Sequence, residues 1–242
     1  MKNTLTTILV LLIFFGGPFY VLLSGKIVLN KHWRIADRSS ANLAPKPSLN
    51  KKAIVQIYAA RAYSWRGMFA VHTWIVVKEE NEDTYTLFQG LGWNAFRKKP
   101  IVDIKKDIPD RIWFEHKPWI LFEIRGDQAK IIIPKIKQLA KEYPYQNKYR
   151  LWPGPNSNTF TAYIVRHILS IKIRLPVTAI GKDYLQNNAI CSKAPSKTGI
   201  QCSIKGLFGF ILAKKEGFEI NLLGLAFSLN TEKPFIHLPG VD

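Results

Sequence analysis

Two short stretches of the sequence hold residue types that could do chemistry together. His72 stands inside the apolar run VHTWIVVK at residues 71–78, and Ser157 follows the turn WPGPN at the start of a predicted helix. The amino terminus of a helix carries free backbone N–H groups and positive potential, which would stabilise an oxyanion formed beside a nucleophile. A histidine on a neighbouring strand could remove the serine proton, so the pair predicts attack on an amide or ester.

Gln89 lies on the next apolar run, residues 84–91, and is the predicted orienter of His72. Its amide can hold the imidazole ring in place, although it cannot stabilise an imidazolium as a carboxylate would. The predicted catalytic residues are therefore Ser157, His72 and Gln89.

Each of these residues also has a purely structural interpretation. Ser157 could cap the helix by accepting backbone N–H groups, or Asn156 could be the cap and Ser157 the first helical residue. His72 could be a packed histidine bonded to a backbone carbonyl, since its place in an apolar run requires a buried partner. Gln89 could be a simple strand residue.

Five further residues are the predicted substrate contacts: Asn156, Asn158, Trp152, Arg66 and Lys182. Trp152 could form an aromatic wall, or it could belong to a rigid Trp-Pro-Gly-Pro turn that fixes the helix start. Arg66 could clamp an anionic group or stack on the adjacent Trp65 in solvent. Lys182 could serve as an alternative base for Ser157 or form a solvated pair with Asp183.

A strand histidine that precedes a helix-start Asn-Ser-Asn-x-Phe resembles the pattern of the circularly permuted papain-like fold. His72 and Thr73 carry the strand part, and the helix part is carried by Asn156, Ser157, Asn158 and Phe160. The permuted papain-like deubiquitinating peptidases and the lecithin retinol acyltransferase group share that fold, so the resemblance implies hydrolase or acyltransferase activity. The stretches AARAYSWRGMFAVHTWIVVK, WPGPNSNTF and LPVTAIGKDYL also resemble a bacterial family of uncharacterised membrane-linked proteins.

Ser157 stands where the papain-like pattern has its nucleophilic cysteine. A thiol is partly ionised near neutral pH, whereas a serine hydroxyl must lose its proton to His72 during attack. A decayed active site would show the same departure. Two functions therefore remain open: a membrane-anchored serine-variant hydrolase or acyltransferase, and a catalytically inactive membrane-tethered binding module that keeps a papain-like pocket.

Apolar periodicity predicts an α+β fold with an antiparallel sheet and a few helices. Strands are expected at residues 53–60, 71–78, 84–91, 112–114 and 119–124, with a charged hairpin turn at 79–83. Helices are expected at 157–170 and at 127–143, where Pro134 would delay the regular helix to about Ile133. The apolar runs at 207–213 and 220–229 predict a second hairpin.

Residues 3–25 carry no charge and, as a helix, are about as long as a bilayer core is thick. They predict a transmembrane anchor or uncleaved signal at 1–25, followed by a basic linker at 26–52 and one α+β domain at 53–242. A cleaved export signal and a buried helix are the alternatives. Basic residues after the span favour a cytoplasmic body and a short basic start favours export; we expect the periplasmic side of a bacterial inner membrane.

The chain of 242 residues carries 35 lysines and arginines against 17 acidic residues, a formal net charge of +18. Such charge permits binding to nucleic acid, to an anionic membrane or to an acidic polymer. Beside an anchor it predicts an anionic lipid surface as partner, and nucleic acid is disfavoured because no RNA-binding motif matches.

Cys191 and Cys202 could pair in an exported setting or be two small buried residues.

Several function classes lack their sequence motif. No glycine-rich phosphate loop and no Gly-x-Ser-x-Gly turn occurs in the sequence. The five histidines are widely separated, and two cysteines provide no spacing for a zinc site. We therefore expect no cofactor and no metal.

Overall fold

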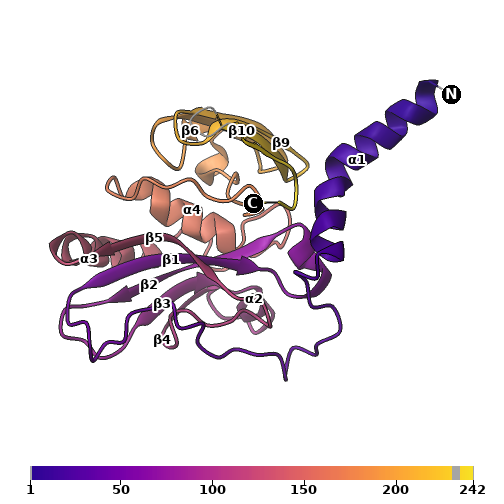
Figure 1. The fold of residues 1–242 in the computed structure, drawn as a ribbon. Coiled ribbons are helices and arrows are strands. Elements are labelled where there is room, and N and C mark those ends of the chain that lie inside the picture. Colours follow the sequence, from indigo (N-terminus) through magenta and orange to yellow (C-terminus); the bar gives the residue numbers. More distant parts are fainter. Residues whose placement is uncertain (1, 231–234, 242) are drawn as a thin grey trace.

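Two antiparallel β-sheets, with helices between and beside them, form the protein in a computed structural model that describes residues 2–230 and 235–241 (Figure 1). The first sheet has the strand order β4-β3-β2-β1-β5 and comprises β1 Ile54–Arg61, β2 Val71–Lys78, β3 Thr86–Gly90, β4 Val102–Lys106 and β5 Trp119–Arg125. The second sheet has the order β11-β10-β9-β8-β7-β6 and comprises β6 Cys191–Lys193, β7 Gly199–Ile204, β8 Phe208–Ala213, β9 Gly217–Leu222, β10 Leu225–Asn230 and β11 Phe235–His237. The fold is therefore α+β with antiparallel sheets and few helices.

The central strands of the first sheet, β1 and β2, are buried along almost their whole length. Burial on both faces explains why each appears in the sequence as an unbroken apolar run. The predicted strands at 53–60, 71–78 and 119–124 match β1, β2 and β5 closely, and the predicted hairpin joins β2 to β3. The prediction at 112–114 is wrong, because Trp113 forms only an isolated bridge with His116.

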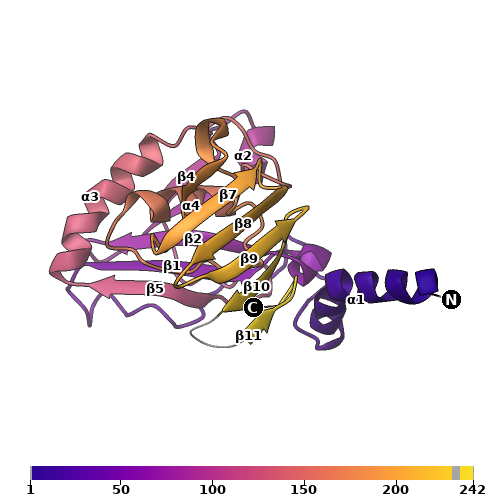
Figure 2. The same ribbon diagram turned by 90° about the horizontal axis from the view of Figure 1, so that it is seen from above.

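Helices α3 Asp127–Lys141 and α4 Ser157–His167 cover one face of the first sheet, and α4 lies between the two sheets (Figures 1 and 2). Their apolar stripes join the main core, which includes Ile57, Ile75, Phe88, Ile132, Ile136, Phe160 and Ile164. α3 is helical from Asp127, so the prediction that Pro134 delays it is wrong. A proline removes one backbone N–H, and the burial of the apolar stripe outweighs that loss here.

Several short elements were not predicted, namely α2 Gly92–Phe96, β4, β6, β7, β11 and the 3₁₀ turns Ser64–Met68 and Gln186–Asn188. The single strand predicted at 220–229 is two strands, β9 and β10. Leu223 and Gly224 join them, both with positive φ. Apolar residues on both sides of this turn made the pair look continuous in the sequence.

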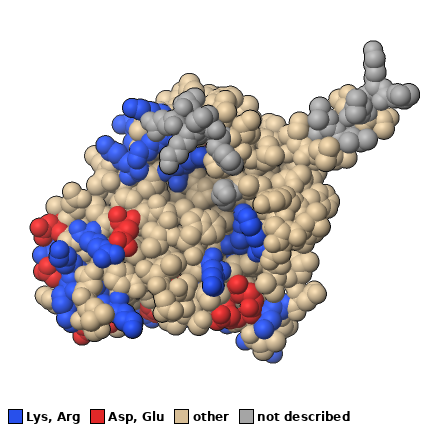
Figure 3. Space-filling model, viewed as in Figure 1, with Lys and Arg blue, Asp and Glu red and all other residues tan. Residues whose placement is uncertain are grey.

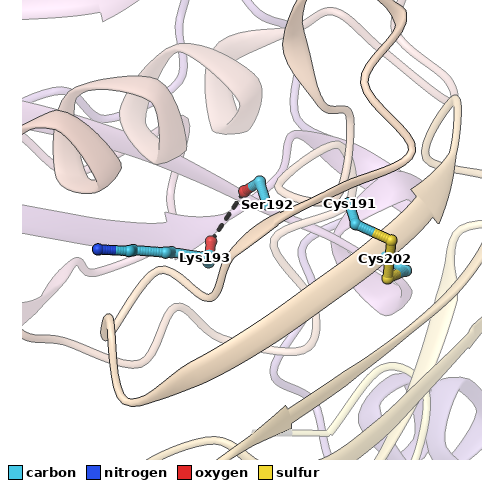
Figure 4. Close-up of a disulfide and its surroundings, with 4 residues drawn as sticks. All are labelled: Cys191, Ser192, Lys193 and Cys202. Atoms are coloured by element: carbon cyan, nitrogen blue, oxygen red, sulfur yellow. Dashed lines mark hydrogen bonds between the residues drawn. A yellow bond between two sulfur atoms is a disulfide. The ribbon is translucent and has the colours of Figure 1, made fainter.

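Cys191 and Cys202 form a disulfide that joins β6 to β7 (Figure 4). The two residues lie directly opposite each other in the antiparallel register of these strands. Of the two interpretations that the sequence left open, the structure contains the bonded pair.

The predicted membrane anchor is corrected by the structure. Helix α1 Lys2–Leu23 occupies that segment, yet no helix in the described part of the chain is long and apolar enough to cross a membrane. The predicted transmembrane helix is therefore wrong, and so is the inner-membrane localisation with a periplasmic body that rested on it.

The carboxy-terminal half of α1 lies against residues 239–241 near the end of the chain, while its amino-terminal half extends away from the body (Figure 1). Val21 is fully buried, and Gly17 approaches Pro239 so closely that a Cβ at residue 17 would clash with the Pro239 carbonyl oxygen. The Gly-Gly-Pro sequence therefore permits a close backbone contact within a continuous helix.

Candidate functional site

A cavity of about 1350 Å³ opens where β2, β3 and the start of α4 meet. Its lining includes all three predicted catalytic residues, His72, Gln89 and Ser157. Each of these side chains belongs to a buried residue, with between 5% and 6% of its surface exposed. The fold therefore brings together residues that are up to 85 positions apart in the chain.

Hydrogen bonds fix the orientation of the His72 ring. Its Nε2 lies 3.3 Å from the Gln89 Oε1, and the Gln89 Nε2 donates to Asp103 Oδ2 at 3.3 Å. Because a carboxylate can only accept, Asp103 turns the nitrogen of the Gln89 amide toward itself and the oxygen toward His72. A neutral His72 must then carry its proton on Nε2, which leaves Nδ1 as the basic nitrogen.

Aromatic rings enclose His72. Trp113 stacks on the imidazole with ring centroids 3.8 Å apart, and Trp74, two residues along β2, stacks at 5.7 Å. Burial lowers the pKa of His72 to about 4, against the hydrogen bond with Gln89, which raises it. His72 is consequently neutral at physiological pH and able to accept a proton.

The start of α4 lies against the end of β3. A Cβ at Gly90 would come within 3.0 Å of the Ser157 Cα, so the glycine next to Gln89 allows the helix start to approach the strand. Ser157 is the first residue of α4, and Asn156 is its N-cap. The sequence left open which of the two capped the helix, and the structure assigns that role to Asn156.

The capping bonds change the predicted oxyanion site. Asn156 Oδ1 accepts the N–H groups of Asn158 at 2.9 Å and Thr159 at 3.1 Å, and the Phe160 N–H bonds to the Asn156 carbonyl. Two of the N–H groups that were expected to be free are thus occupied. The Ser157 N–H is not used by these capping bonds and faces the Tyr149 phenol.

Asn158 fastens the helix start to the strand that carries His72. Its Nδ2 donates to the Val71 carbonyl at 2.9 Å, and its Oδ1 accepts the Thr73 N–H at 3.1 Å and the Thr73 hydroxyl at 2.9 Å. β3 pairs with β2 only from Ile75 onward, so the Asn158 amide acts as the hydrogen-bonding partner of this strand edge. Asn158 therefore bonds to the residues on both sides of His72, namely Val71 and Thr73.

Both asparagines that were predicted as substrate contacts therefore have internal partners for their amide groups. In addition to the capping bonds, Asn156 Nδ2 donates to the carbonyls of Leu151 and Ile180, and Asn158 Nδ2 also donates to Ile180, all at 2.9 Å. Although both residues line the cavity, their side chains build the helix start rather than project unbonded into it.

Tyr149 is a site residue that the sequence analysis missed. Its phenol group faces both the hydroxyl and the backbone N–H of Ser157, contacts that lower its pKa against the larger effect of burial, which raises it. Its ring lies against Gly92, where a Cβ would come within 2.7 Å of it. Tyr149 thus lies beside the hydroxyl of Ser157 and beside the helix-start N–H that the capping bonds do not use.

Asp103 is the second residue that was missed. It lies on β4 directly opposite Gln89 of β3. No pattern in the short sequence VDIKK distinguishes this carboxylate from others on the surface, and only the strand register places it behind Gln89.

The cavity wall is rich in tryptophan and carries positive charge. Six of the seven tryptophans line it: Trp33, Trp65, Trp74, Trp93, Trp113 and Trp152. Trp152 is half exposed and donates its indole N–H to the Leu223 carbonyl at 2.9 Å. Arg66 also lines the cavity and lies over the rings of Tyr63 and Trp65 at 5.7 and 5.8 Å. The structure thus brings Trp152 and Arg66 to the same cavity as His72 and Ser157.

Lys182 lies apart from that cavity. It is almost fully buried beneath the second sheet, where its ammonium group pairs with Asp183 at 2.8 Å and with Glu219. Both interpretations from the sequence, the alternative base and the solvated pair, differ from this position. The described residues contain no group of histidine, cysteine and carboxylate side chains that could hold a metal ion.

Residues 52–184 match the model of a family described as "Protein of unknown function (DUF3750)". The match covers more than half of the chain, so the chain belongs to this family. It includes His72, Gln89, Asp103, Tyr149 and Ser157 and ends before the second sheet begins. No curated protein and no solved structure matches the chain.

Proposed function

We propose that this member of the DUF3750 family is a hydrolase or acyltransferase that acts on an amide or ester through Ser157 and His72. The observation that supports it best is the chain of contacts from Asp103 through Gln89 to His72. That chain selects the imidazole tautomer with a basic Nδ1, in a cavity that also contains a serine at a helix start. It supports the serine-variant papain-like mechanism, which remains a proposal.

In the proposed reaction the Ser157 Oγ attacks the substrate carbonyl carbon while its proton passes to His72 Nδ1. The carbonyl π electrons move to oxygen, and the oxyanion accepts hydrogen bonds from the Ser157 N–H and the Tyr149 hydroxyl. Collapse of the tetrahedral intermediate expels an amine or alcohol, which takes the proton from His72. Water, or a second nucleophile in an acyltransferase, then releases the acyl group from Ser157.

The cavity lining indicates what kind of substrate would fit. Its tryptophan rings, including the half-exposed Trp152, offer flat apolar surfaces for an acyl group or another apolar body. Arg66 would bind an anionic group at the wall, in a bidentate geometry if that group is a carboxylate or phosphate.

A fluorophosphonate activity probe tests the proposal on the full chain. Wild-type protein should be labelled, Ser157→Ala should abolish labelling, and His72→Ala should slow it about 100-fold or more. Ser192→Ala is the matched control, because that hydroxyl lies on β6 and bonds to a neighbouring carbonyl. Absence of labelling in the folded wild-type protein would contradict the proposed enzymatic activity.

One observation favours the second candidate, a non-catalytic binding module. The Tyr149 phenol already contacts both the hydroxyl and the N–H of Ser157, the groups that a reacting carbonyl would use. In this case wild type is unlabelled, and Ser157→Cys is also inert toward thiol-directed acyl probes. Labelling of either protein at residue 157 would exclude the module.

A further inference from the structure

The second sheet has its polar face inside and its apolar face outside. Along β7 and β9 the inward residues include Gln201, Glu219 and Asn221, all nearly fully buried. They meet polar groups from the loop before the sheet: Asn221 donates to Asp183 at 2.8 Å, and Lys182 pairs with Glu219. A buried polar network, together with a small apolar cluster of Ala194, Ile211 and Ala213, therefore fills the inner face of this sheet.

The outward face of the same strands consists of three apolar cross-strand rows, which we call the outer face. In the strand registers the rows are Ile200–Leu212–Phe218–Leu229–Ile236, Cys202–Phe210–Ile220–Phe227 and Ile204–Phe208–Leu222–Leu225. The exposed fraction is 57% at Leu212, 60% at Ile204 and 64% at Ile236. Soluble monomers rarely expose a contiguous apolar surface of this extent, which indicates an interaction surface.

Exposed lysines lie on one edge strand and at two hairpin turns of the outer face. Residues 184–230 contain two acidic residues, Glu216 and Glu219, and both are about 1% exposed. The exposed charges of this segment are lysines at the hairpin turns and on the edge strand, namely Lys193, Lys205, Lys214 and Lys215. Figure 3 shows lysine and arginine side chains in the upper part of the visible face, where the second sheet lies.

We propose that the outer face is a docking surface for an anionic lipid surface. Apolar side chains would enter the interface between head groups and acyl chains, and lysines beside them, such as Lys193 and Lys205, would pair with lipid phosphates. Two neighbouring features extend the same surface. Phe14 of α1 packs edge-on against Phe227 with ring centroids 5.1 Å apart, and Leu225 belongs both to the outer face and to the lining of the candidate active-site cavity.

The charge pattern distinguishes this occupant from a second copy of the chain. Packing two outer faces together would bring two sets of lysines together with no exposed acidic residue of residues 184–230 to pair with them. An anionic lipid surface supplies the complementary charge and places no demand on the shape of the face. The inference is independent of the activity proposed for Ser157.

Co-sedimentation of the full chain with vesicles tests the docking surface. We expect binding to vesicles of phosphatidylcholine with 30% phosphatidylglycerol, and at least about tenfold weaker binding to pure phosphatidylcholine. Phe210→Gln with Leu212→Gln should weaken binding about tenfold or more by removing apolar side chains. Lys193→Gln and Lys205→Gln should each weaken it about fivefold, and added salt should weaken wild-type binding.

Ile131→Gln is the matched control, because Ile131 is an exposed apolar residue on α3, away from the second sheet. It should bind vesicles as wild type does. Failure of wild type to bind anionic vesicles, or unchanged binding by the Phe210 and Leu212 variant, would overturn the proposal. Analytical ultracentrifugation provides the other outcome: a dimer that the same variant dissociates would identify the outer face as a contact between copies.

Discussion

The His72 Nε2 and the Gln89 Oε1 lie 3.3 Å apart, and the other end of the same amide lies 3.3 Å from the Asp103 carboxylate. The arrangement of three adjacent strands creates these contacts. Gln89 of β3 lies opposite Asp103 of β4, and His72 lies on β2. A neutral amide between the two titratable groups transmits orientation but places no charge beside the imidazole. The site therefore has an oriented histidine with a low pKa.

Gln89→Ala should slow fluorophosphonate labelling of Ser157 about 100-fold, because the imidazole loses its orienting partner. The rate of labelling of the folded variant measures this effect. Gln56→Ala is the control, since Gln56 is also a buried glutamine in the first sheet but bonds to Tyr58 and Glu123 instead. Equal labelling rates in wild type and Gln89→Ala would show that Gln89 is only a strand residue.

Stability should fall in acid because of His72. The folded pKa of about 4 lies below the usual 6.5, so between these values the unfolded chain binds a proton that the folded chain does not. The contribution of this pKa difference to the free energy of unfolding is complete above pH 6.5. It is lost as the pH falls toward 4, so the free energy of unfolding decreases by about 3 kcal/mol. Urea unfolding at pH 6.5 and pH 4 should show a smaller decrease in the free energy of unfolding for His72→Gln than for wild type. Equal decreases in the two proteins would mean that the buried imidazole does not cause the loss of stability in acid.

How far the sequence predicts this site depends on whether a residue is placed by local or distant structure. His72 and Ser157 stand out because each lies at a recognisable local feature, an apolar strand and a helix start. Asp103 and Tyr149 do not. Asp103 acquires its position only from the pairing of β4 with β3, and Tyr149 is one of three tyrosines in a loop, selected by its fit against Gly92.

The second sheet shows a different limit. Alternation of apolar and polar residues along β7 and β9 reveals two faces, yet the usual rule that the apolar face points inward gives the wrong result here. The inner residues Gln201 and Glu219 bond to Lys182, Asp183 and Arg166 from distant segments. Those partners are not visible in any local pattern, so the sequence suggested for Lys182 a substrate contact, an alternative base or a solvated pair with Asp183, and not a buried ion pair with Glu219.

Asn158→Ala should destabilise the fold by about 3 kcal/mol, because it leaves the buried Thr73 N–H and Val71 carbonyl without their partner. Chemical denaturation followed by tryptophan fluorescence measures the change. Asn94→Ala is the control: its amide donates to the Pro100 carbonyl at the surface, and its loss should cost less than about 1 kcal/mol. A similarly small cost for Asn158→Ala would remove the argument that this side chain fastens α4 to β2.

Tyr149→Phe separates a catalytic role of the phenol from simple packing. If the hydroxyl donates to the oxyanion, its removal should lower the rate of Ser157 labelling about 100-fold, while the retained ring still fills the space against Gly92. Tyr143→Phe is the matched control. Its hydroxyl is buried without a hydrogen-bond partner among the described residues, so its removal should leave the labelling rate unchanged and not reduce stability.

The opposite result for Tyr149→Phe is equally informative. Faster labelling would mean that the phenol blocks the Ser157 hydroxyl and N–H in the resting protein, as the binding-module alternative requires. In that case Gly92→Ala should also accelerate labelling, because the added Cβ would displace the Tyr149 ring from its position against residue 92. A donor role predicts that both variants are slow, because each removes the hydroxyl from the position where the oxyanion forms.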